Sequence, residues 1–210
     1  MIIGVDFDNT LISYDAVFSA LASEQAFINP DAAANKKSVR DQVRQLPDGE
    51  LKWQKLQSLA YGARILEAKM IDGVAGFFSL CKQQHVPVYI ISHRTETSPF
   101  GAPGESLREA ARTWMSRNGV FDERGFGLSP EQVYFGSTRL EKIGQIVRVG
   151  CSHFIDDLEE VFQEKTFPAG VNKLLYSPDE DAVAHDLIDL PRVMRFQNWQ
   201  QIGEYIFGHC

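Results

Sequence analysis

The stretch Met1–Thr10 reads MIIGVDFDNT and joins a short apolar run to two carboxylates spaced two residues apart. The residues from Ile2 to Val5 are apolar or small, a pattern that predicts a buried strand. Asp6 and Asp8 follow at once, so we expect both at the carboxyl edge of a parallel sheet, where open α/β sheets place their sites. Two carboxylates this close require a compensating cation or a shared proton.

A second acidic strand end occurs far along the chain. The segment 153–155 (HFI) is apolar after its first residue and runs into Asp156 and Asp157. If both strands lie in one parallel sheet, four carboxylates converge, and a hard divalent cation is their simplest partner. Between the two acidic ends, the apolar strand Val88–Ser92 stops at a hydroxyl, and Lys142 lies a short distance before the late acidic pair.

These four features, taken in order, resemble the motifs of the haloacid dehalogenase superfamily of aspartate-nucleophile phosphatases. A lone DxD is common in solvated turns, but four motifs in the right order make the match specific. The resemblance covers roughly residues 1 to 11 and 73 to 176. The matching positions are the DxDxT residues Asp6, Asp8 and Thr10, then Ser92, Lys142 and the pair Asp156 and Asp157.

The resemblance implies a phosphomonoester hydrolase that works through an aspartyl-phosphate. Asp6 would be the nucleophile. Asp8 would protonate the leaving oxygen and later deprotonate the hydrolytic water, while Thr10 would orient these two aspartates by hydrogen bonding. Ser92 would bond a phosphoryl oxygen, and Lys142 would offset the charge of the transferring group and of the carboxylates.

The resemblance also implies Mg²⁺ as the cofactor. Its ligands would be the Asp6 side chain, the Asp8 backbone carbonyl and the late acidic pair, which leaves positions for phosphate and water. Asp157 matches the family's ligand position better than Asp156, which would then act from outside the coordination sphere. The choice between these two stays open from the sequence.

Three further basic side chains are candidates for the site. Arg139 competes with Lys142 for the basic position, and the distance to the late acidic pair favours Lys142. His93 and Arg94 directly follow Ser92 and are candidates for contacting a phosphate or another substrate group. The alternative for this polar pair is that it caps a loop.

The predicted fold is α/β: a three-layer, Rossmann-like core with a five-stranded parallel sheet, plus a small all-helical cap. Residues 1–11 and 73–210 would form the core, and residues 12–72 the cap, which in the family resembled closes over the site and excludes water. The segment 193–196 and an amphipathic helix from about Trp199 would pack onto the core. Besides the first strand, the expected strands are 86–91, 132–135, 153–155 and 172–176, and the expected cap helices are 14–27, 31–46 and 50–70.

Composition limits the partners and the compartment. The 210-residue chain has a formal charge of -7 with its acidic residues spread along the sequence, which does not favour nucleic acid or anionic membranes as partners. Three cysteines without CxxC spacing argue against a disulfide framework or a zinc site. Without a signal-peptide pattern or a membrane-spanning stretch, the expected location is the cytoplasm.

The leading hypothesis is therefore a Mg²⁺-dependent hydrolase of a small phosphorylated metabolite, of the nucleotide or sugar phosphate class. A phosphomutase or phosphotransferase would use the same site but return the phosphoryl group to a substrate. A phospho-ligand-binding module with a silent site is the alternative outside the enzymes, and four intact motifs argue against it. The sequence predicts neither the substrate itself nor the oligomeric state.

Overall fold

The structure is a computed structural model that describes residues 1–29, 35–178 and 193–208. The chain divides into two compact units. The sheet unit contains Met1–Leu11, Ile71–Arg94 and Gly119–Cys210. The helical unit contains Ile12–Met70 and Thr95–Asn118. Each unit has its own core and is described by itself.

The sheet unit is built on six parallel strands in the order β5-β4-β1-β6-β7-β8. The α/β class and the Rossmann-like core are thus confirmed, with one strand more than the sequence predicted. In chain order the strands are β1 (Ile3–Val5), β4 (Val88–His93), β5 (Val133–Gly136), β6 (His153–Asp156), β7 (Asn172–Tyr176) and β8 (Val193–Phe196).

The additional strand, β8, pairs with β7 at the edge of the sheet. All four of its residues are only half-buried. An edge strand of this kind lacks the continuous apolar run that marks the central strands of a parallel sheet, so its pattern is weak. The sequence therefore indicated a short element here without assigning it to the sheet.

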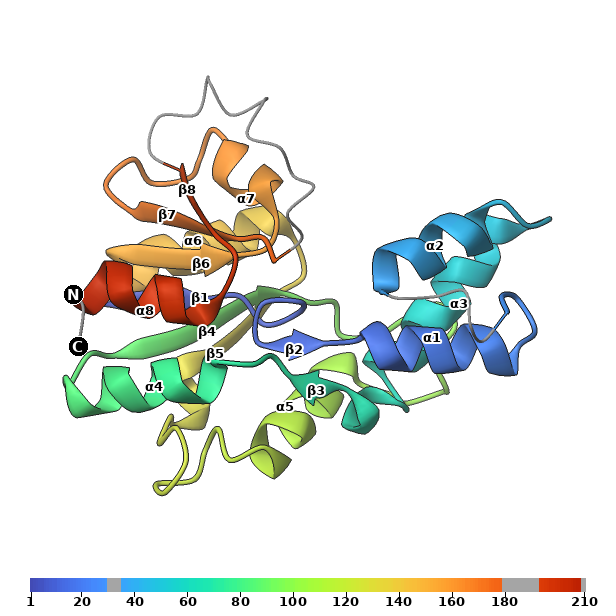
Figure 1. Ribbon diagram of the computed structural model, residues 1–210, viewed down its shortest axis with the longest axis horizontal. Coiled ribbons are helices and arrows are strands. Elements are labelled where there is room, and N and C mark those ends of the chain that lie inside the picture. Colours follow the sequence, from blue (N-terminus) through green and yellow to red (C-terminus); the bar gives the residue numbers. More distant parts are fainter. Residues whose placement is uncertain (30–34, 179–192, 209–210) are drawn as a thin grey trace. The chain divides into compact units, whose positions relative to one another are not determined.

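Helices cover both faces of this sheet (Figure 1). On one face, α6 (Arg139–Val149) and α7 (Glu159–Gln163) pack on strand side chains that include Phe154 and Leu175. The next residue of β7, Tyr176, points to the opposite face because side chains alternate along a strand. There its ring lies 6.1 Å from that of Trp199, which begins α8 (Trp199–Phe207), and α8 packs beside α4 (Val74–Gln83). A short 3₁₀ helix, Pro130–Gln132, precedes β5.

Gly4, in the middle of β1, shows how tightly this core is packed. A Cβ atom at Gly4 would lie 2.5 Å from the ring of Phe154 and 2.9 Å from the sulfur of Cys151. Both neighbours are buried. Only a residue without a side chain therefore fits on this face of β1, two residues before Asp6.

We expect Gly4→Ala to lower the free energy of unfolding by about 1–3 kcal/mol, the usual cost of overpacking a core. Gly144→Ala is the matched control, because a Cβ there, on α6, meets no atom within 4 Å outside its own helix. That control should gain roughly 0.5–1 kcal/mol from the better helix propensity of alanine. Urea unfolding of the two variants checks the prediction, and equal shifts of the same sign would contradict it.

The helical unit contains α1 (Asp15–Glu24), α2 (Lys36–Arg44), α3 (Gly49–Tyr61) and α5 (Leu107–Arg117). The predicted start of the second helix at Asp31 lies outside the described residues. This unit is not all-helical as predicted, because β2 (Ile12–Ser13) and β3 (Lys69–Met70) form an antiparallel ribbon. The predicted helix over 50–70 instead ends at Tyr61.

The early end of α3 has a local cause. Gly62 follows Tyr61 with φ −107° and ψ −108°, outside the helical region. The apolar spacing continues past this break because Ile65, in the 3₁₀ helix Ile65–Glu67, is also buried. Periodicity alone therefore extended the predicted helix too far.

The segment 95–118, which the sequence assigned to the core, lies in the helical unit. Its helix α5 buries an apolar face that includes Trp114. The indole nitrogen of Trp114 donates a buried hydrogen bond of 2.9 Å to the carbonyl of Ala68. The aromatic residues Tyr14, Phe18, Trp53 and Tyr61 form a second packed group inside the same unit.

Two of the three cysteines, Cys81 and Cys151, are buried free thiols, and Cys210 lies outside the described residues. Burial raises the pKa of Cys81 to about 12 and that of Cys151 to about 11, so both thiols are protonated at neutral pH. Among the described helices, none combines the length and the apolar character that crossing a membrane requires.

Candidate active site

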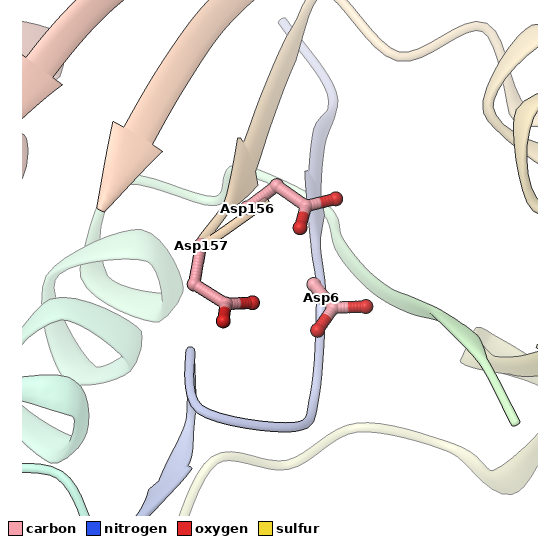
Figure 2. A group of neighbouring side chains, drawn as sticks. All are labelled: Asp6, Asp156 and Asp157. Carbon is pink, nitrogen blue, oxygen red and sulfur yellow. The ribbon is translucent and has the colours of Figure 1, made fainter. Parts of the chain in front are cut away.

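The acidic ends of β1 and β6 meet at the carboxyl edge of the sheet. Val5 pairs with Ile155, and the backbone N–H of Asp6 donates to the carbonyl of Ile155 at 2.9 Å. The next residues along β6 are Asp156 and Asp157, and Figure 2 shows their carboxylates converging with that of Asp6. Carboxylate oxygens of these three aspartates lie within 4.8 Å of one another, so the group could hold a metal ion. We call these residues the aspartate cluster.

Lys142 supplies a positive charge to this cluster. Its Nζ donates to Oδ1 of Asp6 and to Oδ2 of Asp156, each at 2.6 Å, and the side chain is buried. Arg139, the other candidate, lies one turn earlier on α6 and pairs instead with Glu164 at 2.8 Å in a partly exposed position. The structure therefore brings Lys142, and not Arg139, to the aspartates.

Charge and burial act against each other in the cluster. Burial raises the pKa of the Asp6 carboxyl well above its ordinary value, and the ammonium of Lys142 lowers it. The carboxylates of Asp156, Asp157 and Asp8 add to the rise. Burial lowers the pKa of Lys142, but Asp156 and Asp6 raise it more, so the net pKa of this lysine is above its ordinary value. Lys142 is therefore protonated at neutral pH, and further positive charge would be favourable near Asp6.

Asp8 pairs with an arginine outside the aspartate cluster. The Nη1 atom of Arg94 donates to both carboxylate oxygens of Asp8, at 2.7 and 2.9 Å. Arg94 is buried, its guanidinium lies 5.7 Å from the ring centre of Phe7, and its backbone N–H donates to the carbonyl of Gly136 at 2.8 Å. The Asp8 carboxylate thus does not belong to the aspartate cluster. That the backbone carbonyl of Asp8 binds a metal stays a prediction.

The two residues after Ser92 have different surroundings. Arg94 contacts Asp8, whereas His93 is exposed and its Nε2 lies 3.0 Å from the carbonyl of Ser137. His93 thus fits the loop-capping alternative. Ser92 is buried near the end of β4. Because β4 pairs with β1, Ser92 belongs to the strand that neighbours the one before Asp6. Contacts of Ser92, His93 and Arg94 with a phosphate stay predictions.

Thr10 and Asn9 contact the late acidic pair. The hydroxyl of Thr10 donates to Oδ1 of Asp157, and the amide of Asn9 donates to Oδ2 of the same residue, each at 3.3 Å. The sequence predicted that Thr10 orients Asp6 and Asp8, whereas the structure directs its hydroxyl to Asp157. The sequence did not predict a role for Asn9. A detectable signal was an asparagine at the sharp turn after the first strand, where few residue types fit.

The parallel Rossmann-like sheet, with an acidic cluster and a buried lysine at its carboxyl edge, places this protein among the open α/β proteins, which bind their ligands at that edge. Within this class, the chain has the haloacid dehalogenase-like fold. The comparisons with solved structures carry this assignment, because no protein-family model matches the sequence and the curated proteins contain no significant match.

Three of the similar structures illustrate the likeness. A haloacid dehalogenase-like hydrolase from Streptococcus pneumoniae aligns with a TM-score of 0.60 at 13% identity, over 97% of this chain and 97% of that one. A hydrolase from Deinococcus radiodurans, solved with bound phosphate and sodium, gives 0.57 at 16% identity over 98% and 94%. A hydrolase from Ehrlichia chaffeensis gives 0.53 at 14% identity over 98% and 95%. At these identities the likeness establishes the fold alone.

Proposed function

We propose that this protein is a Mg²⁺-dependent phosphomonoester hydrolase that acts through an aspartyl-phosphate on Asp6. Its substrate would be a small phosphorylated metabolite of the nucleotide or sugar phosphate class. The observation that carries the proposal is the convergence of Asp6, Asp156 and Asp157 with Lys142 at one sheet edge. The structurally similar hydrolase from Deinococcus radiodurans was solved with phosphate and a cation, which supports the same kind of ligand here.

The donor set fits Mg²⁺. Three carboxylates offset by the single ammonium of Lys142 leave two negative charges, which one divalent cation balances. Carboxylate oxygens are the ligands that this hard cation prefers. When bound, Mg²⁺ would neutralise charge on the phosphoryl oxygens and help to orient the phosphate group for attack.

Asp157 suits the direct metal ligand better than Asp156. Both oxygens of Asp156 accept short bonds: Oδ2 from Lys142 at 2.6 Å and Oδ1 from the backbone N–H of Leu158 at 3.0 Å. Asp156 is also completely buried, whereas Asp157 is half-buried and its hydrogen bonds from Asn9 and Thr10 are longer, at 3.3 Å. We therefore assign Asp156 the task of holding Lys142, and Asp157 that of binding the cation.

In the proposed reaction, a carboxylate oxygen of Asp6 attacks phosphorus and the bond from phosphorus to the substrate oxygen breaks. Asp8 gives a proton to that leaving oxygen, and in the second step takes a proton from the water that attacks the aspartyl-phosphate. Asp8 must carry a proton before the first step, so its contact with Arg94 would have to loosen when substrate binds. That contact places the Asp8 side chain outside the aspartate cluster. Ser92 would donate a hydrogen bond to a phosphoryl oxygen, and Lys142 would offset the charge of the transferring group.

The metal-binding geometry favours phosphate over halide chemistry. One similar structure, at 11% identity and a TM-score of 0.52, is described as that of a dehalogenase. Displacement of halide requires the nucleophile but neither a proton donor for an alkoxide nor a cation to neutralise phosphoryl oxygens. The proposed metal ligand Asp157 and the separate Asp8 would then have no task.

Phosphate release from p-nitrophenyl phosphate, with Mg²⁺ or with EDTA, tests the proposal. We expect turnover with Mg²⁺ and at least a hundredfold loss in EDTA, since metal-assisted charge neutralisation contributes several kcal/mol. A panel of nucleotides and sugar phosphates, scored by the same release of inorganic phosphate, would then identify the substrate class. Turnover that EDTA leaves unchanged, or a complete lack of phosphate release from the panel, would contradict the proposal; isomerised product without free phosphate would indicate a mutase.

A further inference from the structure

Asn9 occupies a backbone position that most residues avoid. Its φ is +58°, in the left-handed region, where only glycine is free of strain and asparagine is among the few other residues that fit readily. The turn places Asn9 directly between Asp8 and Thr10, after the end of β1. Glycine would satisfy the backbone equally well, so an asparagine here points to a task for the amide.

The amide contacts the carboxylate that we assign to the cation. Asn9 Nδ2 donates to Oδ2 of Asp157 at 3.3 Å, while Thr10 Oγ1 donates to Oδ1 of the same group at 3.3 Å. Asn9 and Thr10, two consecutive residues of the first motif, thus hold the two oxygens of one carboxylate. Asp157 lies 148 residues after Asn9 in the sequence. Lys142 holds the other two members of the aspartate cluster, Asp6 and Asp156.

We infer that Asn9 is a positioning residue for metal binding, which fixes the Asp157 carboxylate so that it faces Asp6. This inference rests on the proposed function for the identity of the cation. Asp157 is half-buried and directly follows the end of β6, so its side chain is less restrained by packing than that of Asp156. Donors that fix the direction of such a ligand typically contribute a factor of about 10–100 in metal affinity.

Different variants can separate the effect of the Asn9 backbone conformation from the effect of its side-chain amide. Asn9→Gly removes the amide and keeps the left-handed conformation, whereas Asn9→Ala removes the amide and adds backbone strain. His85→Gly is the matched control: His85 also belongs to the sheet unit and has a φ of +54°, but it is exposed at the end of α4. This control changes the backbone in the same way without a contact to the aspartate cluster.

Mn²⁺ binding in the absence of substrate, followed by electron paramagnetic resonance of the free ion, is the primary measurement. We expect Asn9→Gly to weaken binding about tenfold, and His85→Gly to leave it unchanged. We also expect Asn9→Gly to raise the Mg²⁺ concentration for half-maximal phosphate release by a similar factor, with kcat restored at saturating Mg²⁺. Asn9→Ala should show the same weakened binding together with a lower midpoint of thermal unfolding.

The result separates this inference from the proposed function. Equal Mn²⁺ affinity in the wild type and in Asn9→Gly, with metal-dependent phosphate release intact, would refute the role of Asn9 alone. A wild-type protein that binds no Mn²⁺ and releases no phosphate would refute both. An equal loss of affinity in His85→Gly would show that a backbone change, and not the amide, causes the effect.

Discussion

Asp6→Asn is expected to lower kcat for phosphate release by roughly four to six orders of magnitude, the usual effect of removing a catalytic nucleophile. An amide has nearly the same shape as the carboxylate, but its oxygen is a poor nucleophile and carries no charge toward the cation. The decrease would be measured with p-nitrophenyl phosphate at saturating Mg²⁺. Circular dichroism and a cooperative unfolding transition would check that the variant is folded.

Asp157→Asn is the comparison that distinguishes loss of the nucleophile from loss of a metal ligand. It removes the proposed metal ligand and leaves the nucleophile, so its loss of activity should be partly recovered at high Mg²⁺ concentration. The loss in Asp6→Asn should not respond to Mg²⁺. If Asp6→Asn retained wild-type turnover, Asp6 would not be the nucleophile. If its lost activity returned with added metal, Asp6 would act as a metal ligand and not as the nucleophile.

Lys142→Met is expected to cost about 3–5 kcal/mol in the free energy of unfolding, because it leaves buried carboxylates without their cation. Lys142 Nζ bonds Asp6 and Asp156 at 2.6 Å each, and all three side chains are buried. Methionine keeps most of the volume, so the loss reports charge more than packing. Urea unfolding in EDTA measures it without compensation by a metal ion.

Arg139→Met is the matched control for this variant. Arg139 lies on the same helix, but its side chain is 41% exposed and its ion pair with Glu164 lies at the surface. Such pairs contribute about 0–1 kcal/mol. We also expect Lys142→Met to lose phosphatase activity while Arg139→Met keeps it. Similar destabilisation by the two substitutions would contradict the assignment of Lys142 as the charge partner of the buried aspartates.

The central sheet and its acidic edge could be predicted because their signals are local and strong. Short apolar runs that end in polar residues identify the strands that surround β1, and parallel pairing then brings their carboxyl ends together. The convergence of Asp6 with Asp156 and Asp157 follows from this topology. Lys142 could be ranked above Arg139 by its distance from Asp156 in the sequence. In the structure Lys142 is buried, whereas Arg139, one helical turn away, is partly exposed.

The remaining features depend on pairing that no local pattern encodes. The strand β8 is half-buried at a sheet edge, and the ribbon of β2 and β3 has only two residues a strand. The association of α5 with the helical unit depends on long-range contacts such as that from Trp114 to Ala68. In the site, the partners of Asn9 and Thr10 follow from the direction of a turn, which a motif does not specify.

The pairing of Arg94 with Asp8 illustrates the same limit. The sequence placed Arg94 two residues after Ser92 and left its partner open. The structure places the ends of β1 and β4 side by side, so the charge of Asp8 is met by an arginine 86 positions away along the chain. Residue type indicated that Arg94 could bind an anion, and only the three-dimensional arrangement identified which one.

Trapping the covalent intermediate is the most direct test of the proposal that Asp6 is the nucleophile. The protein would be mixed with p-nitrophenyl phosphate and Mg²⁺, quenched during turnover and reduced with borohydride, which converts an aspartyl-phosphate to homoserine. Peptide mass spectrometry would then locate the product. We predict homoserine at position 6 in the substrate-treated sample and an unmodified Asp6 when substrate is omitted. Continued phosphate release with no reduced residue, or with reduction at Asp8, Asp156 or Asp157 instead, would contradict the proposal that Asp6 is the nucleophile.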